Sequence, residues 1–255
     1  MSQMPVALQL YTVRDALAED FVGTVRQVAE MGYAGVEFGD TGPMSPVELS
    51  AFLDDLGLEP AGVHVGFDVL EQDLERVIED NLTMRNPWVV CPWMPEDRRV
   101  DAAGWRQVAG TMNEIGARLR EAALQLCYHS HSFEFQRFEG QTGFDLFYAA
   151  ADPQCVQAEI DTYWVQHGGE DPVATIRRFA GRCPLVHLKD MANDEPRSFA
   201  EVGNGILDFP GIFAASAEAG VKWYIVEQDV CPGPSLESAR VSLENLKRWG
   251  VAPAT

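Results

Sequence analysis

The sequence predicts one (β/α)8 barrel, a closed sheet of eight parallel strands surrounded by helices. The chain has 255 residues, close to the ~250 that such a barrel needs. Eight short apolar runs recur with their starts 26–38 residues apart, which leaves room for one helix and two loops between strands. No glycine-rich phosphate-binding loop follows the first run, and this disfavours an open doubly wound sheet. We expect residues 1–255 to form a single domain.

The expected strands are continuous apolar runs rather than alternating ones, as in parallel strands that are covered on both faces. They are VALQLY (6–11), AGVEF (34–38), PAGVHVG (60–66), WVVCPW (88–93), LQLCYHSH (124–131), VQAEID (156–161), PLVHLKD (184–190) and KWYIVEQ (222–228).

The expected helices lie between these runs, and several carry boundary signals. Gly32, Gly57 and Gly220 each follow an amphipathic segment and are placed as helix ends. Ser45 precedes Pro46, a favourable N-cap followed by proline in the first helical turn. The helices predicted by range are 16–31, 46–56, 102–123, 172–180, 209–219 and 235–249.

Composition excludes some classes of partner. The chain has 39 acidic and 19 basic residues and a net charge of −20, which repels phosphate backbones and anionic lipids. We therefore expect no nucleic acid and no membrane partner. The five cysteines form no CxxC motif, and neither a signal peptide nor a membrane-spanning run is evident, so we expect a cytoplasmic protein with free thiols. A homo-oligomer is compatible with the sequence.

Polar side chains gather where the strands end, which is the catalytic face of such barrels. Four of the five histidines lie there, and carboxylates follow strands 2, 6 and 8. The histidines at strand ends are His64, His129, His131 and His187. Imidazole and carboxylate together suit Mn²⁺, Co²⁺, Zn²⁺ or Fe²⁺, although the same groups also serve metal-free acid–base catalysis.

At these residues the chain resembles the xylose isomerase-like barrel superfamily, in the branch called sugar phosphate isomerase/epimerase. The superfamily also holds inosose dehydratases, ketose 3-epimerases and AP endonucleases of the endonuclease IV type. The resemblance covers nearly the whole chain. It is carried by LQLYTVRD (8–15), GYAGVEF (32–38), GVHVGFD (62–68), YHSHSFEF (128–135), EIDTYWVQHGGEDP (159–172), HLKDM (187–191), EVGNGILDFPGI (201–212) and VEQDV (226–230).

The resemblance implies one divalent metal ion, with Mn²⁺ expected first and Co, Zn, Fe or Mg as alternatives. Three ligands carry over by position: Asp161, His187 and Glu227. Many relatives have Glu at the end of strand 5, where this chain has His129. The fourth ligand is therefore His129 or, from the following loop, Glu134.

The same resemblance implies catalytic and substrate-binding roles. Glu227 and Glu134 are candidate bases, and Lys189 would stabilise a developing oxyanion or instead pair with Asp190 or Glu227. The candidate substrate-binding residues are Gln9, Glu37, His64, His131, Trp164 and Glu201.

The expected activity is a metal-dependent isomerisation or epimerisation of a sugar or related polyol through an enediolate-type proton transfer. The alternatives are a lyase that dehydrates a keto-cyclitol or keto-sugar, and a non-catalytic sugar-binding barrel. Few basic residues lie near the strand ends, so a neutral sugar or cyclitol is expected rather than a phosphorylated one. Trp164 stands where AP endonucleases have a histidine, which argues against that activity.

Overall fold

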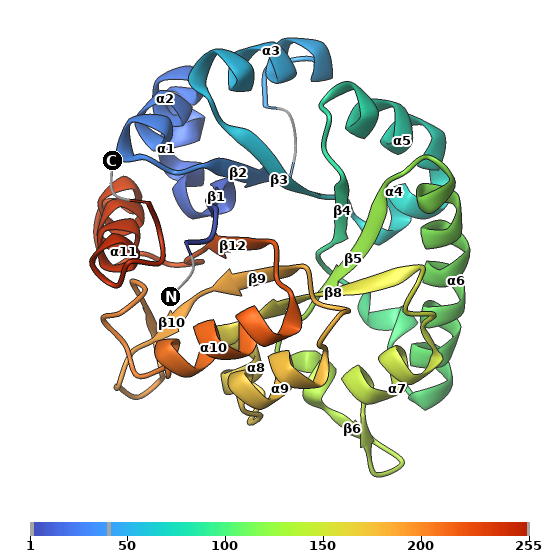
Figure 1. Ribbon diagram of the computed structural model, residues 1–255. Coiled ribbons are helices and arrows are strands. Elements are labelled where there is room, and N and C mark those ends of the chain that lie inside the picture. The colour runs from blue at the N-terminus through green and yellow to red at the C-terminus, as the bar shows by residue number, and fades with distance from the viewer. Residues whose placement is uncertain (1–2, 40–41, 254–255) are drawn as a thin grey trace.

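The computed structural model describes residues 3–39 and 42–253 and shows a closed barrel of eight parallel strands (Figure 1). Around the barrel the strands follow the order β1, β2, β3, β4, β5, β8, β9 and β12, and β12 closes against β1. The predicted (β/α)8 fold is confirmed, and all eight strands fall within the predicted runs apart from Glu59 at the start of β3. The barrel strands are β1 (Val6–Gln9), β2 (Gly35–Phe38), β3 (Glu59–His64), β4 (Trp88–Cys91), β5 (Gln125–His129), β8 (Val156–Asp161), β9 (Leu185–Leu188) and β12 (Trp223–Val226).

Helices surround the barrel and cover its outer face (Figure 1). They are α1 (Arg14–Glu19), α2 (Phe21–Met31), α3 (Pro46–Leu56), α4 (Phe67–Gln72), α5 (Leu74–Thr83), α6 (Ala102–Glu121), α7 (Gly143–Ala150), α8 (Thr162–His167), α9 (Pro172–Arg178), α10 (Phe209–Ala219) and α11 (Ser235–Arg248). Short 3-10 turns and two-stranded ribbons lie in the loops: η1 (Leu10–Val13), η2 (Glu96–Arg98), η3 (Phe133–Phe135), β6 (Arg137–Phe138), β7 (Gln141–Thr142), β10 (Asp190–Met191) and β11 (Phe199–Ala200).

The helix boundaries follow local chemistry. Ser45 and Glu48 form a capping box at the start of α3, and Gly32, Gly57 and Gly220 end their helices in the left-handed region, as predicted. The predicted helix 16–31 is instead two helices. Asp20 is extended and its carboxylate accepts the N–H of Gly23, so it ends α1 and caps α2.

Two apolar cores hold the barrel. The larger one lies between the strands and the surrounding helices, and includes Trp105, Phe147 and Leu243. The smaller one fills the interior of the barrel below the catalytic face. It consists of Ala7, Ala61, Val90, Cys127, Leu185, Trp223 and Ile225. Side chains two residues further along several of these strands point into the same interior and are polar.

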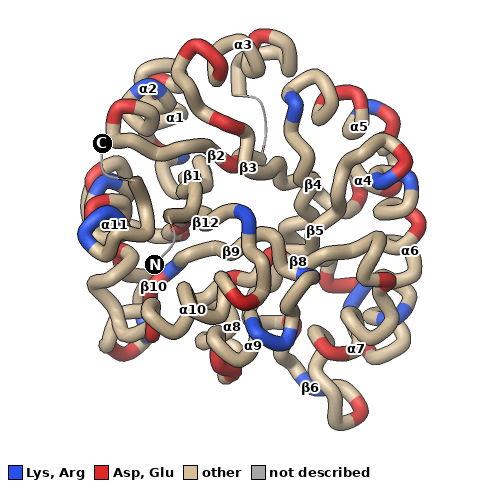
Figure 2. The backbone as a smooth tube through the Cα atoms, in the orientation of Figure 1, with Lys and Arg blue, Asp and Glu red and all other residues tan. Residues whose placement is uncertain are grey.

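The acidic residues lie mostly on the outer helices and loops, interspersed with fewer basic ones (Figure 2). All five cysteines are free, and four of them are buried. Among the described residues, no helix combines the length and the apolar character that a membrane crossing requires.

Candidate active site

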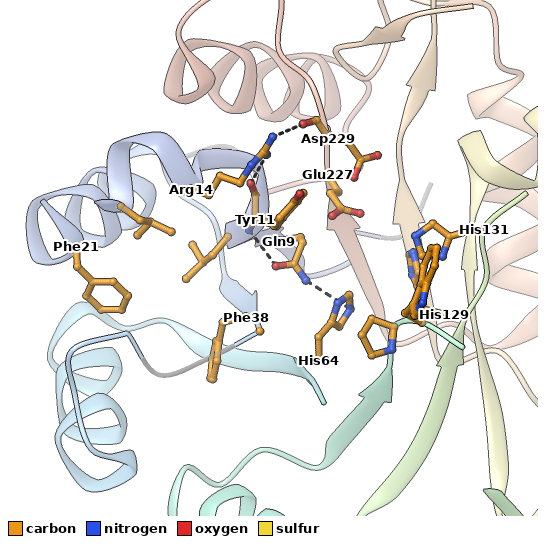
Figure 3. A pocket seen from close by; sticks show the side chains of 15 residues that line it. Gln9, Tyr11, Arg14, Phe21, Phe38, His64, His129, His131, Glu227 and Asp229 are labelled. Carbon is orange, nitrogen blue, oxygen red and sulfur yellow. Dashed lines mark hydrogen bonds between the residues drawn. The ribbon is translucent and has the colours of Figure 1, made fainter. Parts of the chain in front are cut away.

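A cavity of about 430 Å³ opens at the C-terminal ends of the strands. Its size lies in the range of clefts that enclose small-molecule ligands. Figure 3 shows histidines and carboxylates on one side and apolar side chains on the other. The lining residues are Gln9, Leu10, Tyr11, Arg14, Leu17, Phe21, Phe38, Gly39, His64, Pro92, Trp93, His129, His131, Glu227 and Asp229.

Strand register brings the predicted ligands together. Asp161 on β8 pairs in register with His187 on β9, and β5 and β12 flank them with His129 and Glu227. One nitrogen or oxygen from each of these four side chains lies within 4.8 Å of the others. Nitrogen and oxygen ligands lie ~2.0–2.2 Å from zinc, so two of them are at most ~4.4 Å apart and the four atoms would close slightly around an ion. All four side chains are buried.

Two further carboxylates, Glu37 and Glu159, lie deeper in the barrel and hold the histidines. Both are fully buried. His129 Nδ1 donates to Glu159 (2.9 Å), and His187 Nε2 donates to Glu37 (2.7 Å). His64 Nε2 lies 3.0 Å from Glu37 and 3.3 Å from Glu159. The inner nitrogens of His129 and His187 are thus engaged by carboxylates, while their outer nitrogens face Asp161 and Glu227.

The protonation of the histidines follows from these contacts. Burial disfavours a charge on His64, but the carboxylates of Glu37 and Glu159 outweigh it and raise the pKa to about 10. The pKa of His187 is likewise raised against burial by Glu159 and Glu37. Burial and the adjacent charge of His187 hold the pKa of His129 well below its usual value. Without an ion, His129 is therefore neutral at neutral pH beside two imidazolium ions, and an ion bound by His187 would replace the Nδ1 proton of His187.

The neutral state of His129 leaves a lone pair on its outer nitrogen. Nδ1 carries the proton that Glu159 accepts, so Nε2 faces the Asp161 carboxylate, 3.8 Å away, without a proton between them. Asp161 Oδ2 accepts no well-aligned hydrogen bond from a described residue, although Lys189 Nζ lies 3.0 Å away. Burial raises the Asp161 pKa to about 6 against the opposing charge of Lys189.

These observations fit a divalent cation. Two lone pairs that face each other in a buried site are stabilised by a cation between them. Two imidazole nitrogens and two carboxylate oxygens are a donor set that Mn²⁺, Co²⁺, Zn²⁺ and Fe²⁺ accept. The carboxylates behind the histidines orient them as carboxylates commonly do for histidine ligands. The residues that would hold the ion are His129, Asp161, His187 and Glu227.

Lys189 is fully buried beneath the cavity and does not line it. Its ammonium lies 2.8 Å from Glu227, 2.9 Å from Asp229 and 3.0 Å from Asp161. The alternative pairing with Glu227 is therefore present. The other pairing does not form, because Asp190 accepts the backbone N–H groups of Met191, Gly203, Gly205 and Leu207. Lys189 balances carboxylate charge from behind the site.

Glu134 does not join the cluster. The Tyr128 hydroxyl donates to its Oε1 (2.6 Å) and the His131 backbone N–H donates to its Oε2 (2.8 Å). Burial raises its pKa to about 7. The carboxylate is thus turned towards Tyr128, which packs on Phe147 outside the barrel. Of the two candidates for the strand 5 ligand, the structure brings His129 to the other ligands and leaves Glu134 apart.

Three of the six expected substrate-binding residues line the cavity: Gln9, His64 and His131. Glu37 lies behind them, where the Gln9 side-chain amide donates to it (2.8 Å). Trp164 is also outside the lining and packs against His131 and Lys189.

Glu201 is the sixth expected residue, and it points elsewhere. Its carboxylate accepts from the Ser238 hydroxyl (2.8 Å) and the Asn204 amide (3.2 Å). The loop curls back because Asp190 collects the N–H groups of Gly203 and Gly205, which turns Glu201 towards α11.

Two site residues were missing from the predicted set. Glu159 precedes Asp161 by two residues, so the period-two alternation of a strand places both in the interior. This alternation is the sequence signal that could have identified Glu159 as a site residue. Asp229 follows Glu227 by two residues and lines the cavity while it contacts Lys189.

Comparison with known proteins gives consistent matches over most of the chain. Residues 25–249 match the model of a family described as the xylose isomerase-like TIM barrel. The inosose dehydratase of Geobacillus kaustophilus is 28% identical over 248 residues, which cover 81% of this chain and 79% of that protein. A rhizopine catabolism protein of Rhizobium meliloti is 25% identical over 272 residues, which cover 89% and 80%.

A solved structure shares the fold closely. A sugar phosphate isomerase/epimerase from Parabacteroides distasonis superposes with a TM-score of 0.86 at 23% identity, with 99% of this chain and 96% of that chain covered. At 23% identity this similarity shows a shared fold.

Proposed function

The chain belongs to the xylose isomerase-like TIM barrel family, and from this membership we propose that it is a metal-dependent enzyme that removes the proton beside the carbonyl group of a neutral keto-cyclitol or keto-sugar. We propose dehydration as the outcome. The observation that carries the proposal is the buried set of His129, Asp161, His187 and Glu227, which reaches the cavity through His129 and Glu227. The similarity to inosose dehydratase supports the choice of reaction.

The ion would be held by these four side chains, with Mn²⁺ expected first. When bound, it supplies Lewis acidity, which polarises a carbonyl oxygen and stabilises negative charge that develops there. Glu37 and Glu159 hold the imidazoles of His187 and His129 in the orientation that keeps their outer nitrogens towards the ion. Lys189 limits repulsion between Asp161, Glu227 and Asp229.

The proton acceptor is Asp229 or Glu227, the two carboxylates among the described lining residues. Glu227 is also a ligand candidate, and its carboxylate already contacts His187 and Lys189. Asp229 belongs to no ligand group and is the more accessible of the two. We assign proton abstraction to Asp229 and ion binding to Glu227. This assignment replaces Glu134, whose carboxylate is bound to Tyr128.

Loss of a β-hydroxyl group requires a proton donor on the cavity wall. His64 lines the cavity and retains its proton because Glu37 and Glu159 stabilise the imidazolium ion. Its side chain is 14% exposed, so a leaving hydroxyl group could reach it. We propose that His64 protonates the leaving hydroxyl as water departs.

Isomerisation is the second candidate, because one carboxylate can return the abstracted proton to the neighbouring carbon. Epimerisation by two opposed carboxylates is less well supported. Glu227 and Asp229 both follow β12, so the two carboxylates of the described lining stand on one wall.

Metal analysis and product analysis test the proposal together. Metal content is measured on wild type, His187→Ala, Glu227→Gln and Asp229→Asn, and each is assayed in D2O with Mn²⁺ and inosose. We expect about one ion in wild type and Asp229→Asn, loss of the ion in the other two, and a product lacking one water. Asp229→Asn should lower kcat by ~10²–10⁴-fold.

Other outcomes decide between the alternatives. A product of unchanged mass that contains solvent deuterium would establish isomerisation or epimerisation instead of dehydration. Binding without deuterium exchange would identify a sugar-binding barrel. Absence of metal from wild type, even after incubation with Mn²⁺, would refute the metal-dependent mechanism.

A further inference from the structure

The cavity has two chemically different ends (Figure 3). One end carries the imidazoles and carboxylates described above. At the other end, the described lining residues Leu10, Leu17, Phe21 and Phe38 are all uncharged, and we call them the apolar lobe. Figure 3 shows Phe21 and Phe38 on the side away from His129 and His131. Both ends belong to one continuous cavity of about 430 Å³.

The apolar lobe is built by the break between α1 and α2. Leu17 lies on α1, and Phe21 is the first residue of α2, directly after the helix break at Asp20. Leu10 follows β1 and Phe38 ends β2, and both are almost fully buried. Leu17 and Phe21 are only half-buried and present apolar surface to the cavity. Covering that surface with an apolar group of a ligand removes it from water and is favourable.

The charges of the described lining residues disfavour an anionic occupant of the cavity. Arg14 is the one Lys or Arg among the described lining residues. Its guanidinium stacks on Tyr11 at 4.1 Å and donates to the backbone carbonyls of Tyr11 and Asp229 (2.8 Å each). The opposite end carries Glu227 and Asp229. Among the described lining residues, a phosphate group would therefore find two carboxylates and one cation, whose guanidinium already donates to two carbonyls.

We propose that the substrate is a polyhydroxylated ring that bears a ketone and carries an uncharged apolar substituent, as in the keto derivative of an aryl or alkyl glycoside, with the ring at the polar end and the substituent in the apolar lobe. This inference rests on the proposed function for the position of the ring. The apolar substituent is the group that a free sugar or a sugar phosphate lacks. Trp93 and Tyr11, about half exposed beside the cavity, would flank the bound molecule.

The test compares ligands that share a ring and differ in the substituent. Phenyl and methyl glycosides of glucose, galactose and mannose are titrated into the Mn²⁺-loaded protein by calorimetry, with glucose 6-phosphate and inosose alongside. We expect at least one phenyl glycoside to bind about tenfold or more tightly than its methyl partner, since even one buried methylene is worth ~10-fold or more. Glucose 6-phosphate should bind no better than glucose.

A pair of variants locates the effect. Leu17→Ser should reduce the preference for phenyl over methyl to near unity, because it places a hydroxyl in the apolar lobe. Leu82→Ser is the matched control: Leu82 is 50% exposed on α5 and lies outside the cavity, so the preference should persist.

Each remaining outcome counts against the inference. Equal binding of phenyl and methyl members in every pair, absence of binding by all glycosides, tighter binding of the phosphate, or a preference that survives Leu17→Ser would overturn it. These failures leave the proposed function standing if the protein still binds Mn²⁺ and converts inosose. Loss of metal binding and of turnover would refute the proposed function itself.

Discussion

Glu159 does not line the cavity, yet it contacts three histidines of the candidate centre. It accepts from His129 and lies 3.3 Å from both His64 and His187. Burial and the nearby charge of Glu37 both oppose its ionisation, but His187 and His129 outweigh them and lower its pKa to about 2. It is therefore a carboxylate at neutral pH and can orient the histidines.

This position makes Glu159→Gln informative. The amide retains the shape of the side chain but loses the charge that holds the Nδ1 proton of His129. We expect Mn²⁺ affinity to fall by ~10–100-fold, as for other partners of metal-bound histidine. Isothermal titration of purified wild type and variant with Mn²⁺ measures the change.

Glu134→Gln is the matched control, since Glu134 is equally buried but bonded to Tyr128. It should leave Mn²⁺ affinity close to that of wild type. Equal losses in the two variants would mean that Glu134 is a ligand after all, and an unchanged affinity in Glu159→Gln would remove its positioning role.

At the scale of single residues, the sequence located the ligand candidates but not their support. Asp161, His187 and Glu227 could be predicted because each stands at or beside a strand end. Glu159 was passed over because it stands two positions before such an end. The position of Glu201 could not be predicted, because it depends on hydrogen bonds from a loop to Asp190.

Among the elements, α6 shows how closely the helical layer sits on the strands. Gly116 is buried on α6, and a Cβ atom built there would overlap the carbonyl oxygen of Cys155. That oxygen belongs to the backbone just before β8, so it cannot move aside cheaply. The same helix has Gly110 on its exposed face, where a Cβ would meet no heavy atom within 4 Å.

The two glycines predict opposite effects of one substitution. Gly116→Ala should lower the free energy of unfolding by ~1–3 kcal/mol through overpacking. Gly110→Ala should raise it by ~0.5–1 kcal/mol, because alanine favours the helix. Urea unfolding followed by circular dichroism measures both. An increase in the free energy of unfolding of both variants would show that helix propensity dominates at both sites.

Most elements could be predicted because apolar runs and glycine stops are local signals. The break between α1 and α2 could not, because residues 16–31 keep a helical pattern throughout. Asp20 breaks that pattern through a side-chain cap that competes with continued helix. This break forms the apolar lobe, so the feature least visible in the sequence shapes the cavity.

At the scale of the whole molecule, repulsion among the excess acidic residues is the dominant long-range interaction. The net charge of −20 repels itself in the folded state more than in an expanded chain. Exposed ion pairs such as Arg177–Glu218 offset this only slightly.

Salt should therefore stabilise the protein. Raising NaCl from 10 to 300 mM screens the repulsion, and we expect Tm to rise by about 2 °C or more. Differential scanning calorimetry with EDTA in both buffers measures this without a contribution from divalent ions. A lower Tm at high salt would mean that the surface ion pairs outweigh the net repulsion.

The smaller apolar core, which fills the interior of the barrel, also affects the kinetics of ligand binding. Ala7, Cys127, Leu185 and Ile225 close the interior immediately below the ligand candidates. These described residues are apolar and fully buried, so we expect an ion and an organic ligand to use the same opening. The ion would then load first and leave last, and a bound ligand would slow its extraction by a chelator.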